Sequence, residues 1–123
     1  MRNKSKSKIR VIAGVLAFTT LLFASNVNAV GHFVAGAKVL RVLTEDVSYG
    51  GCMALVDVAM PEGCQQWVSF DCTGTYYDKE LAENRLAAAM LALSSQNTVH
   101  LNVLDDVKHG QYCVARRIDI LAN

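Results

Sequence analysis

Proline is almost absent from this chain, and the single proline, Pro61, stands alone. The chain has no internal repeat, low-complexity tract or stretch of linker composition, so nothing in it indicates a division into two domains. It contains no G-x-S-x-G sequence and no pair of cysteines separated by two residues. The first absence argues against a hydrolase with a nucleophile elbow. The second argues against a four-thiolate zinc site.

The N-terminal residues have the composition of a leader. The first ten hold five basic side chains and no acid, and an apolar run follows over residues 11–24. That run is shorter than the roughly 20 residues of a membrane-spanning helix, which disfavours an uncleaved anchor. Small residues, Val27 and Ala29, come next. The pattern is typical of a secretory signal peptide, so we predict export and cleavage between Ala29 and Val30, with cleavage after Ala24 as the alternative.

Cleavage would change the charge of the chain. The precursor has twelve basic and eleven acidic residues and a formal net charge of +1, whereas residues 30–123 keep seven basic and all eleven acidic residues, a net of −4. This balance argues against nucleic acid, whose backbone is recognised by a basic face. It is compatible with a neutral or cationic partner. We expect residues 30–123 to form a single disulfide-bonded domain with no membrane contact after cleavage.

All four cysteines lie in the predicted mature part, at Cys52, Cys64, Cys72 and Cys113. An even number in a short exported chain indicates two disulfides.

The hydrophobic pattern predicts a mainly β domain with one helix. The helix is expected over residues 79–93, where alanine and leucine dominate and no β-branched residue occurs, with Asp78 as its N-cap. Its buried stripe is expected at Ala82, Leu86, Ala89, Met90 and Leu93. Residues 105–111 have the composition of a polar turn. Strands are predicted over residues 37–44, 52–59, 65–72, 99–103 and 112–121.

This order, with the helix between the third and fourth strands, favours a five-stranded OB-like barrel. An open α+β sandwich with the helix on one face is the alternative.

The hairpin between the second and third strands suggests how the cysteines pair. If its turn centres on Glu62, Val56 faces Val68 and Cys52 faces Cys72. Directly opposed side chains in a ladder are close enough for a disulfide.

Cys64 and Cys113 then remain, and in an OB barrel they would open two parallel, neighbouring strands at the same end. Cys72 and Cys113 would instead lie at opposite ends, about 25 Å apart. We therefore predict the disulfides Cys52–Cys72 and Cys64–Cys113.

Three segments resemble a family of small secreted bacterial proteins without an established activity: GGCMA at 50–54, WVSFDCTG at 67–74 and DDxKHxxYCVARRID at 105–119. The resemblance implies export and this fold class, and it implies no particular chemistry. Two positions depart from the family pattern. Asp78-Lys79 stands where a Ser-Lys pair usually begins the helix, and Gly110-Gln111 stands where the family usually has Asn-Gly. The strand order is also similar to that of the OB-like B subunits of pentameric bacterial toxins, which bind glycans.

The segment 105–111 is one candidate site, because Asp105, Asp106, Lys108 and His109 are close in sequence. They could bind a cation or contact a sugar, or they could form a solvated turn. Their spacing matches no known metal loop, so no metal or cofactor is expected.

Aromatic side chains are the other candidates, because Trp67, Tyr76, Tyr77 and Tyr112 could stack on sugar rings. Trp67 falls on the strand face opposite Val68, so it either points outward or lies beneath a flanking segment.

No nucleophile and base are predicted together, so we expect no catalytic residue. The sequence favours an exported binding module whose partner is a protein, a second copy of the chain or a glycan. A monomeric inhibitor or accessory subunit of another secreted protein is the alternative, and a small secreted enzyme is less favoured.

Overall fold

The structure, a computed structural model, describes residues 31–123. The predicted leader and the predicted cut between Ala29 and Val30 lie outside these residues. The described part is mainly β with one helix, and the helix lies between the third and fourth strands, as the sequence predicts. The strands are β1 (Gly31–Thr44), β2 (Cys52–Val56), β3 (Trp67–Ser69), β4 (Thr98–His109) and β5 (Tyr112–Ile120), with a short 3₁₀ turn η1 (Ser48–Gly50) and the helix α1 (Lys79–Ser95).

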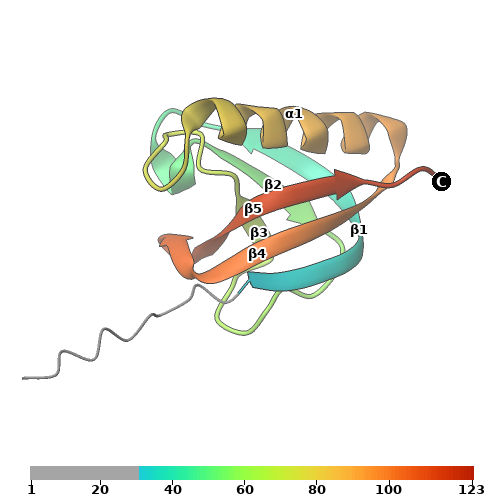
Figure 1. The fold of residues 1–123 in the computed structure, drawn as a ribbon, viewed down its shortest axis with the longest axis horizontal. Helices are drawn as coiled ribbons and strands as arrows, with labels where there is room; N and C mark the ends of the chain where they lie inside the picture. Colours follow the sequence, from blue (N-terminus) through green and yellow to red (C-terminus); the bar gives the residue numbers. More distant parts are fainter. Residues whose placement is uncertain (1–30) are drawn as a thin grey trace, which may run out of the picture.

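The strands are hydrogen-bonded in the order β1-β2-β3-β5-β4, and the sheet closes into a barrel because β1 also pairs with β4. All neighbours are antiparallel except β3 and β5, which run parallel. The helix lies across one side of the barrel, and the β4–β5 hairpin projects from the end near η1 (Figure 1). Within residues 31–123, no helix combines the length and the hydropathy needed to cross a membrane.

β1 is longer than predicted, because it begins at Gly31 instead of residue 37. Its first half pairs with β4 and its second half with β2. A bulge between Val34 and Ala37 includes Gly36, whose φ is +69°, and the strand passes from β4 to β2 just after it, between Lys38 and Val39. A bulge of this kind is how a strand turns the corner of a small barrel.

The helix begins where predicted, and the Asp78 carboxylate accepts hydrogen bonds from the backbone N–H groups of Glu80 and Leu81. Its buried residues are Ala82, Ala89 and Ala92. The prediction that Met90 is buried was wrong, because its side chain is 53% exposed. Small alanines let the helix backbone approach the barrel closely, and the long side chains lie at the edges of that contact.

The two disulfides are those that the sequence predicts, Cys52–Cys72 and Cys64–Cys113. The register that suggested the first of them was wrong by two residues, because Ala54 pairs with Val68 instead of Phe70. β3 ends at Ser69, and Asp71 then takes a left-handed conformation with φ +65°, which turns Cys72 back toward Cys52. The cysteines therefore meet beyond the end of the ladder.

The polar turn predicted over residues 105–111 is mostly strand. β4 continues to His109, and only Gly110 and Gln111 connect it to β5. Leu104 pairs with Val114 and Lys108 with Cys113, so residues 105–107 form a bulge with no partner on β5. This last part of β4 is mostly polar, so it lacks the alternation that marks a half-buried strand.

Candidate functional site

Three tyrosines and a histidine gather where the β4–β5 hairpin meets η1. His109 and Tyr112 are opposite each other in the ladder. The ring of Tyr49 packs edge-on against that of Tyr112 with centroids 4.9 Å apart, and Tyr76 packs similarly against His109 at 5.1 Å. Tyr49 and Tyr76 remain 46% and 51% exposed. We call this group, Tyr49, Tyr76, His109 and Tyr112, the tyrosine end.

The backbone at Tyr49 is unusual, since its φ is +51°. A bulky side chain rarely adopts this left-handed conformation, and such residues cluster at functional positions. The Ser69 hydroxyl donates a hydrogen bond of 2.8 Å to the Tyr49 carbonyl oxygen and helps to hold the turn. The conformation places the Tyr49 ring against Tyr112 at the surface.

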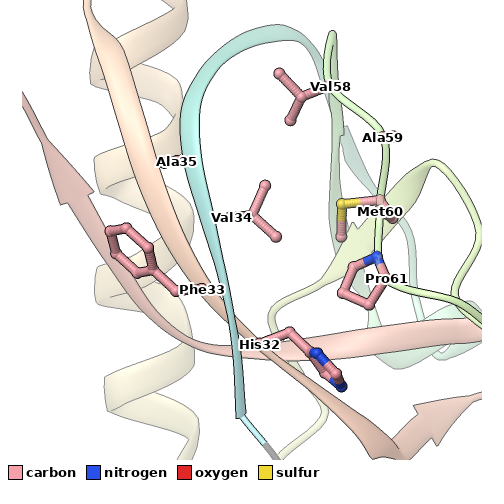
Figure 2. A pocket seen from close by; sticks show the side chains of 8 residues that line it. All are labelled: His32, Phe33, Val34, Ala35, Val58, Ala59, Met60 and Pro61. Carbon is pink, nitrogen blue, oxygen red and sulfur yellow. The ribbon is translucent and has the colours of Figure 1, made fainter.

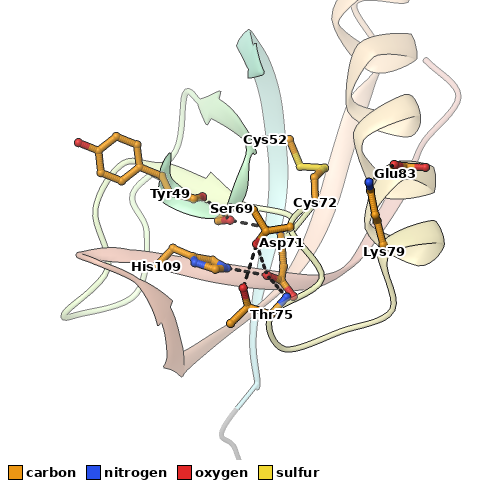
Figure 3. Close-up of a disulfide and its surroundings, with 10 residues drawn as sticks. Tyr49, Cys52, Ser69, Asp71, Cys72, Thr75, Lys79, Glu83 and His109 are labelled. Atoms are coloured by element: carbon orange, nitrogen blue, oxygen red, sulfur yellow. Dashed lines mark hydrogen bonds and ion pairs between the residues drawn. A yellow bond between two sulfur atoms is a disulfide. The ribbon is translucent and has the colours of Figure 1, made fainter. Parts of the chain in front are cut away.

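Beneath the tyrosine end lies the buried carboxylate of Asp71, which has no exposed surface. Its oxygens accept hydrogen bonds from the backbone N–H groups of Thr75, Tyr76 and Tyr77 at 3.2, 2.7 and 2.8 Å. A further hydrogen bond of 2.6 Å joins it to His109 Nε2. Figure 3 shows the Asp71 carboxylate between His109 and the loop that leads to α1. One side chain therefore fixes the positions of both Tyr76 and His109.

Burial is the largest influence on the pKa of Asp71, and it acts to raise it. The hydrogen bonds from Tyr76, Tyr77, His109 and Thr75 together outweigh burial and hold the pKa of Asp71 below its ordinary value. The carboxylate is therefore ionised at neutral pH and can only accept hydrogen bonds. His109 must donate from Nε2.

A histidine paired with a buried aspartate is also the geometry of a catalytic base, but among residues 31–123 no hydroxyl or thiol is hydrogen-bonded to the other ring nitrogen of His109. Asp71 is fully buried, and the His109 side chain is only 14% exposed with Nε2 already bonded. The nearby Ser69 hydroxyl is buried, and its proton goes to the Tyr49 carbonyl. The arrangement is suited to holding the tyrosine end in one conformation.

Gly50 allows this packing. A Cβ atom at residue 50 would lie 2.5 Å from Ser69 Oγ and 2.6 Å from His109 Cδ2, and φ is +83°. Replacing Gly50 with alanine is expected to lower the free energy of unfolding by about 2–5 kcal/mol, from left-handed strain together with overpacking. Urea denaturation measures this change.

The matched control is Gly110→Ala. Gly110 also has positive φ, +64°, but a Cβ atom there would meet nothing within 4 Å. Its cost is expected to be about 1–2 kcal/mol, from strain alone. Equal costs for the two variants would contradict the close packing of His109 over Gly50.

The structure separates the charged residues predicted to act together. Asp105 bonds to His32 Nε2 at 2.8 Å, and this hydrogen bond is the main cause that holds the pKa of Asp105 below its ordinary value. Lys108 Nζ donates to the Gly63 carbonyl, and Asp106 is exposed. His109 turns to Asp71 instead. Among residues 31–123, no group of three or more His, Cys, Asp or Glu side chains is placed to hold a metal ion.

Two of the predicted aromatic candidates lie elsewhere. Trp67 is half-buried, with the Arg41 guanidinium 5.5 Å from its ring centroid. Tyr77 is half-buried beneath Arg85, whose guanidinium carbon is 5.2 Å from the ring centroid. The predicted candidates that come together are Tyr76, His109 and Tyr112. Trp67 and Tyr77 lie apart from them.

A groove of about 350 Å³ lies between β1 and the loop that joins β2 to β3. Figure 2 shows Val34, Val58, Met60 and Pro61 around this space, with Phe33 on the other side of β1. His32 lies at its rim, where it bonds to Asp105.

Sequence reasoning did not single out Tyr49, Asp71 or His32. The roles of Tyr49 and Asp71 depend on their left-handed backbone conformations. Apart from neighbouring glycines, the local sequence does not indicate either conformation. His32 precedes the predicted first strand, so its partner depends on the unexpected length of β1.

No protein-family model matches the chain, and no curated protein is significantly similar to it.

Proposed function

We propose that this chain is an exported, non-catalytic binding module that contacts a glycan or another exported protein through the tyrosine end. The observation that carries the proposal is the tyrosine end, in which the exposed rings of Tyr49 and Tyr76 pack against the part-buried Tyr112 and His109, above the buried Asp71. Tyrosine is enriched at binding surfaces because its ring is apolar and its hydroxyl can still bond.

Rigidity strengthens this argument. Tyr76 is held at both ends, because its N–H donates to Asp71 and its hydroxyl donates to the Lys108 carbonyl oxygen at 2.9 Å. The Cys52–Cys72 disulfide ties the adjoining loop to β2. A surface ordered before binding loses less conformational entropy when a partner arrives.

Two further observations support export and an OB-like assignment. Two disulfides are typical of proteins that fold in an oxidising compartment, which agrees with the predicted leader and favours the periplasm or the exterior. The parallel pairing of β3 with β5, together with a helix between β3 and β4, is the arrangement expected of an OB-like barrel.

The test is photocrosslinking in cells that export the full chain. A benzophenone amino acid replaces Tyr49 in one sample and Leu91, an exposed residue of α1, in the control. We expect an adduct from position 49 only, identified by mass spectrometry. The identified partner, once purified, should bind a Tyr49→Ala and Tyr76→Ala double variant at least about thirtyfold more weakly than the unchanged protein.

A glycan array, probed with the unchanged protein and with the double variant, tests whether the partner is a glycan. An adduct between two copies of the chain would favour a ring-forming, toxin-B-like subunit. An adduct with a different exported protein would favour the inhibitor or accessory subunit. The proposal fails if position 49 yields no more adduct than position 91 and the double variant matches the unchanged protein on the array.

A further inference from the structure

Three of the four arginines in residues 31–123 line one groove. It has a volume of about 300 Å³ and lies between α1 and β5. Arg85 comes from the helix, and Arg116 and Arg117 come from the strand. The predicted mature chain carries a net charge of −4, so this gathering of positive charge is a local exception to its overall charge.

A bulge in β5 brings the two strand arginines to the surface together. Val103 of β4 pairs with Ala115, and Asn102 pairs with Arg117, so Arg116 is the extra residue between them. Successive strand residues normally point to opposite faces, and a bulge interrupts that alternation. Both arginines are exposed as a result.

Arg85 has unmet hydrogen-bonding capacity. Its NH1 atom is buried without a hydrogen-bond partner among the described residues, while its guanidinium lies over the Tyr77 ring. A buried donor that belongs to a charged group is costly when it is left unpaired, because it has lost its hydrogen bonds to water. An unsatisfied group of this kind in a folded protein calls for an acceptor such as a bound anion or a water.

The two strand arginines keep most of their donors. Arg116 donates from Nε to the Asn102 side chain at 2.6 Å, and Arg117 donates from Nε to Asp119 at 2.8 Å. These bonds leave the terminal nitrogens of each guanidinium for another acceptor. Asp119 neutralises the charge of Arg117, and the ionised Asp71 offsets part of the charge of Arg85, so the groove retains an excess of at least about one positive charge.

We propose that this groove, the arginine groove, binds a small ligand through an oxyanion group, either a carboxylate, a sulfate or a phosphate. The planar fork of a guanidinium matches the paired oxygens of such groups. Leu81, Ala88 and Ile118 also line the groove and offer apolar surface to the body of the ligand. The site uses none of the tyrosine end, so it stands or falls separately from the proposed function.

The test is a titration of the oxidised protein, recovered from cells that express the full chain, followed by NMR of ¹⁵N-labelled backbone and arginine side-chain groups. Phosphate, sulfate and glucuronate are added in separate experiments at constant ionic strength, with chloride as the reference. We expect at least one of them to give saturable shifts at Arg85, Ala88, Arg116 and Ile118. The ligand that saturates at the lowest concentration identifies the oxyanion class.

Arg116→Gln is the main variant, because the residue is exposed and its loss should not unfold the protein. It is expected to weaken binding by about tenfold, and Arg85→Gln is expected to weaken it by at least as much. Lys79→Gln is the matched control, because Lys79 is a cation on the same helix that does not line the groove. The proposal is overturned if no anion gives saturable shifts, or if Lys79→Gln weakens binding as much as Arg116→Gln does.

Discussion

Replacing Asp71 with asparagine is expected to lower the free energy of unfolding by about 3 kcal/mol. The asparagine has the same shape, but an NH2 group replaces one of the two carboxylate oxygens. That group is a donor, and it would face the donors that now bond to the oxygen. Three backbone N–H groups and His109 Nε2 point at that carboxylate. Breaking a buried, hydrogen-bonded charge pair costs about 3–5 kcal/mol, and the amide oxygen recovers part of that.

The same carboxylate predicts how stability depends on pH. Because the pKa of Asp71 is lower in the folded protein than its ordinary value, its contribution is fully present above the unfolded pKa of about 3.9. It is lost as the pH falls through the lower folded pKa. Between pH 7 and pH 3, urea denaturation of the unchanged protein should therefore show a steeper loss of stability than the Asp71→Asn variant shows.

Asp106→Asn is the control for both measurements. Asp106 lies on the β4–β5 hairpin, as His109 does, but it is exposed, so its replacement should change the free energy of unfolding by less than about 0.5 kcal/mol. If Asp71→Asn were equally mild, the hydrogen bonds to Asp71 would not be what fixes the loop.

Replacing both Cys64 and Cys113 with alanine is expected to lower the free energy of unfolding by about 4 kcal/mol. The disulfide closes a loop with a sequence separation of 49, and its main effect is to restrict the unfolded chain. Replacing Cys52 and Cys72 opens a loop of separation 20, so the expected loss is smaller, about 3 kcal/mol. A small domain is stable by roughly 5–15 kcal/mol, so either loss is a large fraction of the total.

Urea denaturation of the two double variants, each compared with the unchanged oxidised protein, measures both losses. Reduction of the unchanged protein should give a loss at least as large as that of either variant. A larger loss for the Cys52 and Cys72 pair would show that native packing around Cys52, and not loop length, sets the order.

The sequence predicts the element order and the disulfides well, because both depend on strong patterns. Alternating apolar residues reveal a strand wherever one face is buried, as in residues 99–103 of β4. The continuation of β4 to His109 has no such face, so its polar residues resemble a turn. The early part of β1 is missed for a similar reason, since Gly31, Ala35 and Gly36 give it little strand propensity.

The error in the β2–β3 register is instructive, because it left the disulfide prediction correct. A shift of two residues preserves which side chains face the core, so Ala54 and Val68 remain inside under either register. The pattern therefore cannot tell the two registers apart. The left-handed turn at Asp71 decides between them, and that turn depends on contacts with distant residues.

The candidate site could be predicted only in part. His109, Tyr112 and Tyr76 are visible as polar and aromatic residues in otherwise unremarkable segments. Their assembly depends on Asp71, which is far from His109 in sequence. No periodicity or spacing links two residues that meet only because β5, the hairpin partner of β4, is the neighbour of β3 in the barrel.

The two disulfides interleave along the chain, since Cys64 lies between Cys52 and Cys72 while its partner is Cys113. A chain exported N-terminus first, as proposed, presents Cys64 to the oxidising compartment before Cys72. An oxidase that joins cysteines in their order of emergence would link Cys52 to Cys64, and the native pairs would then require thiol–disulfide exchange after Cys113 has crossed. The maturation of this protein would in that case depend on a disulfide isomerase as well as on an oxidase.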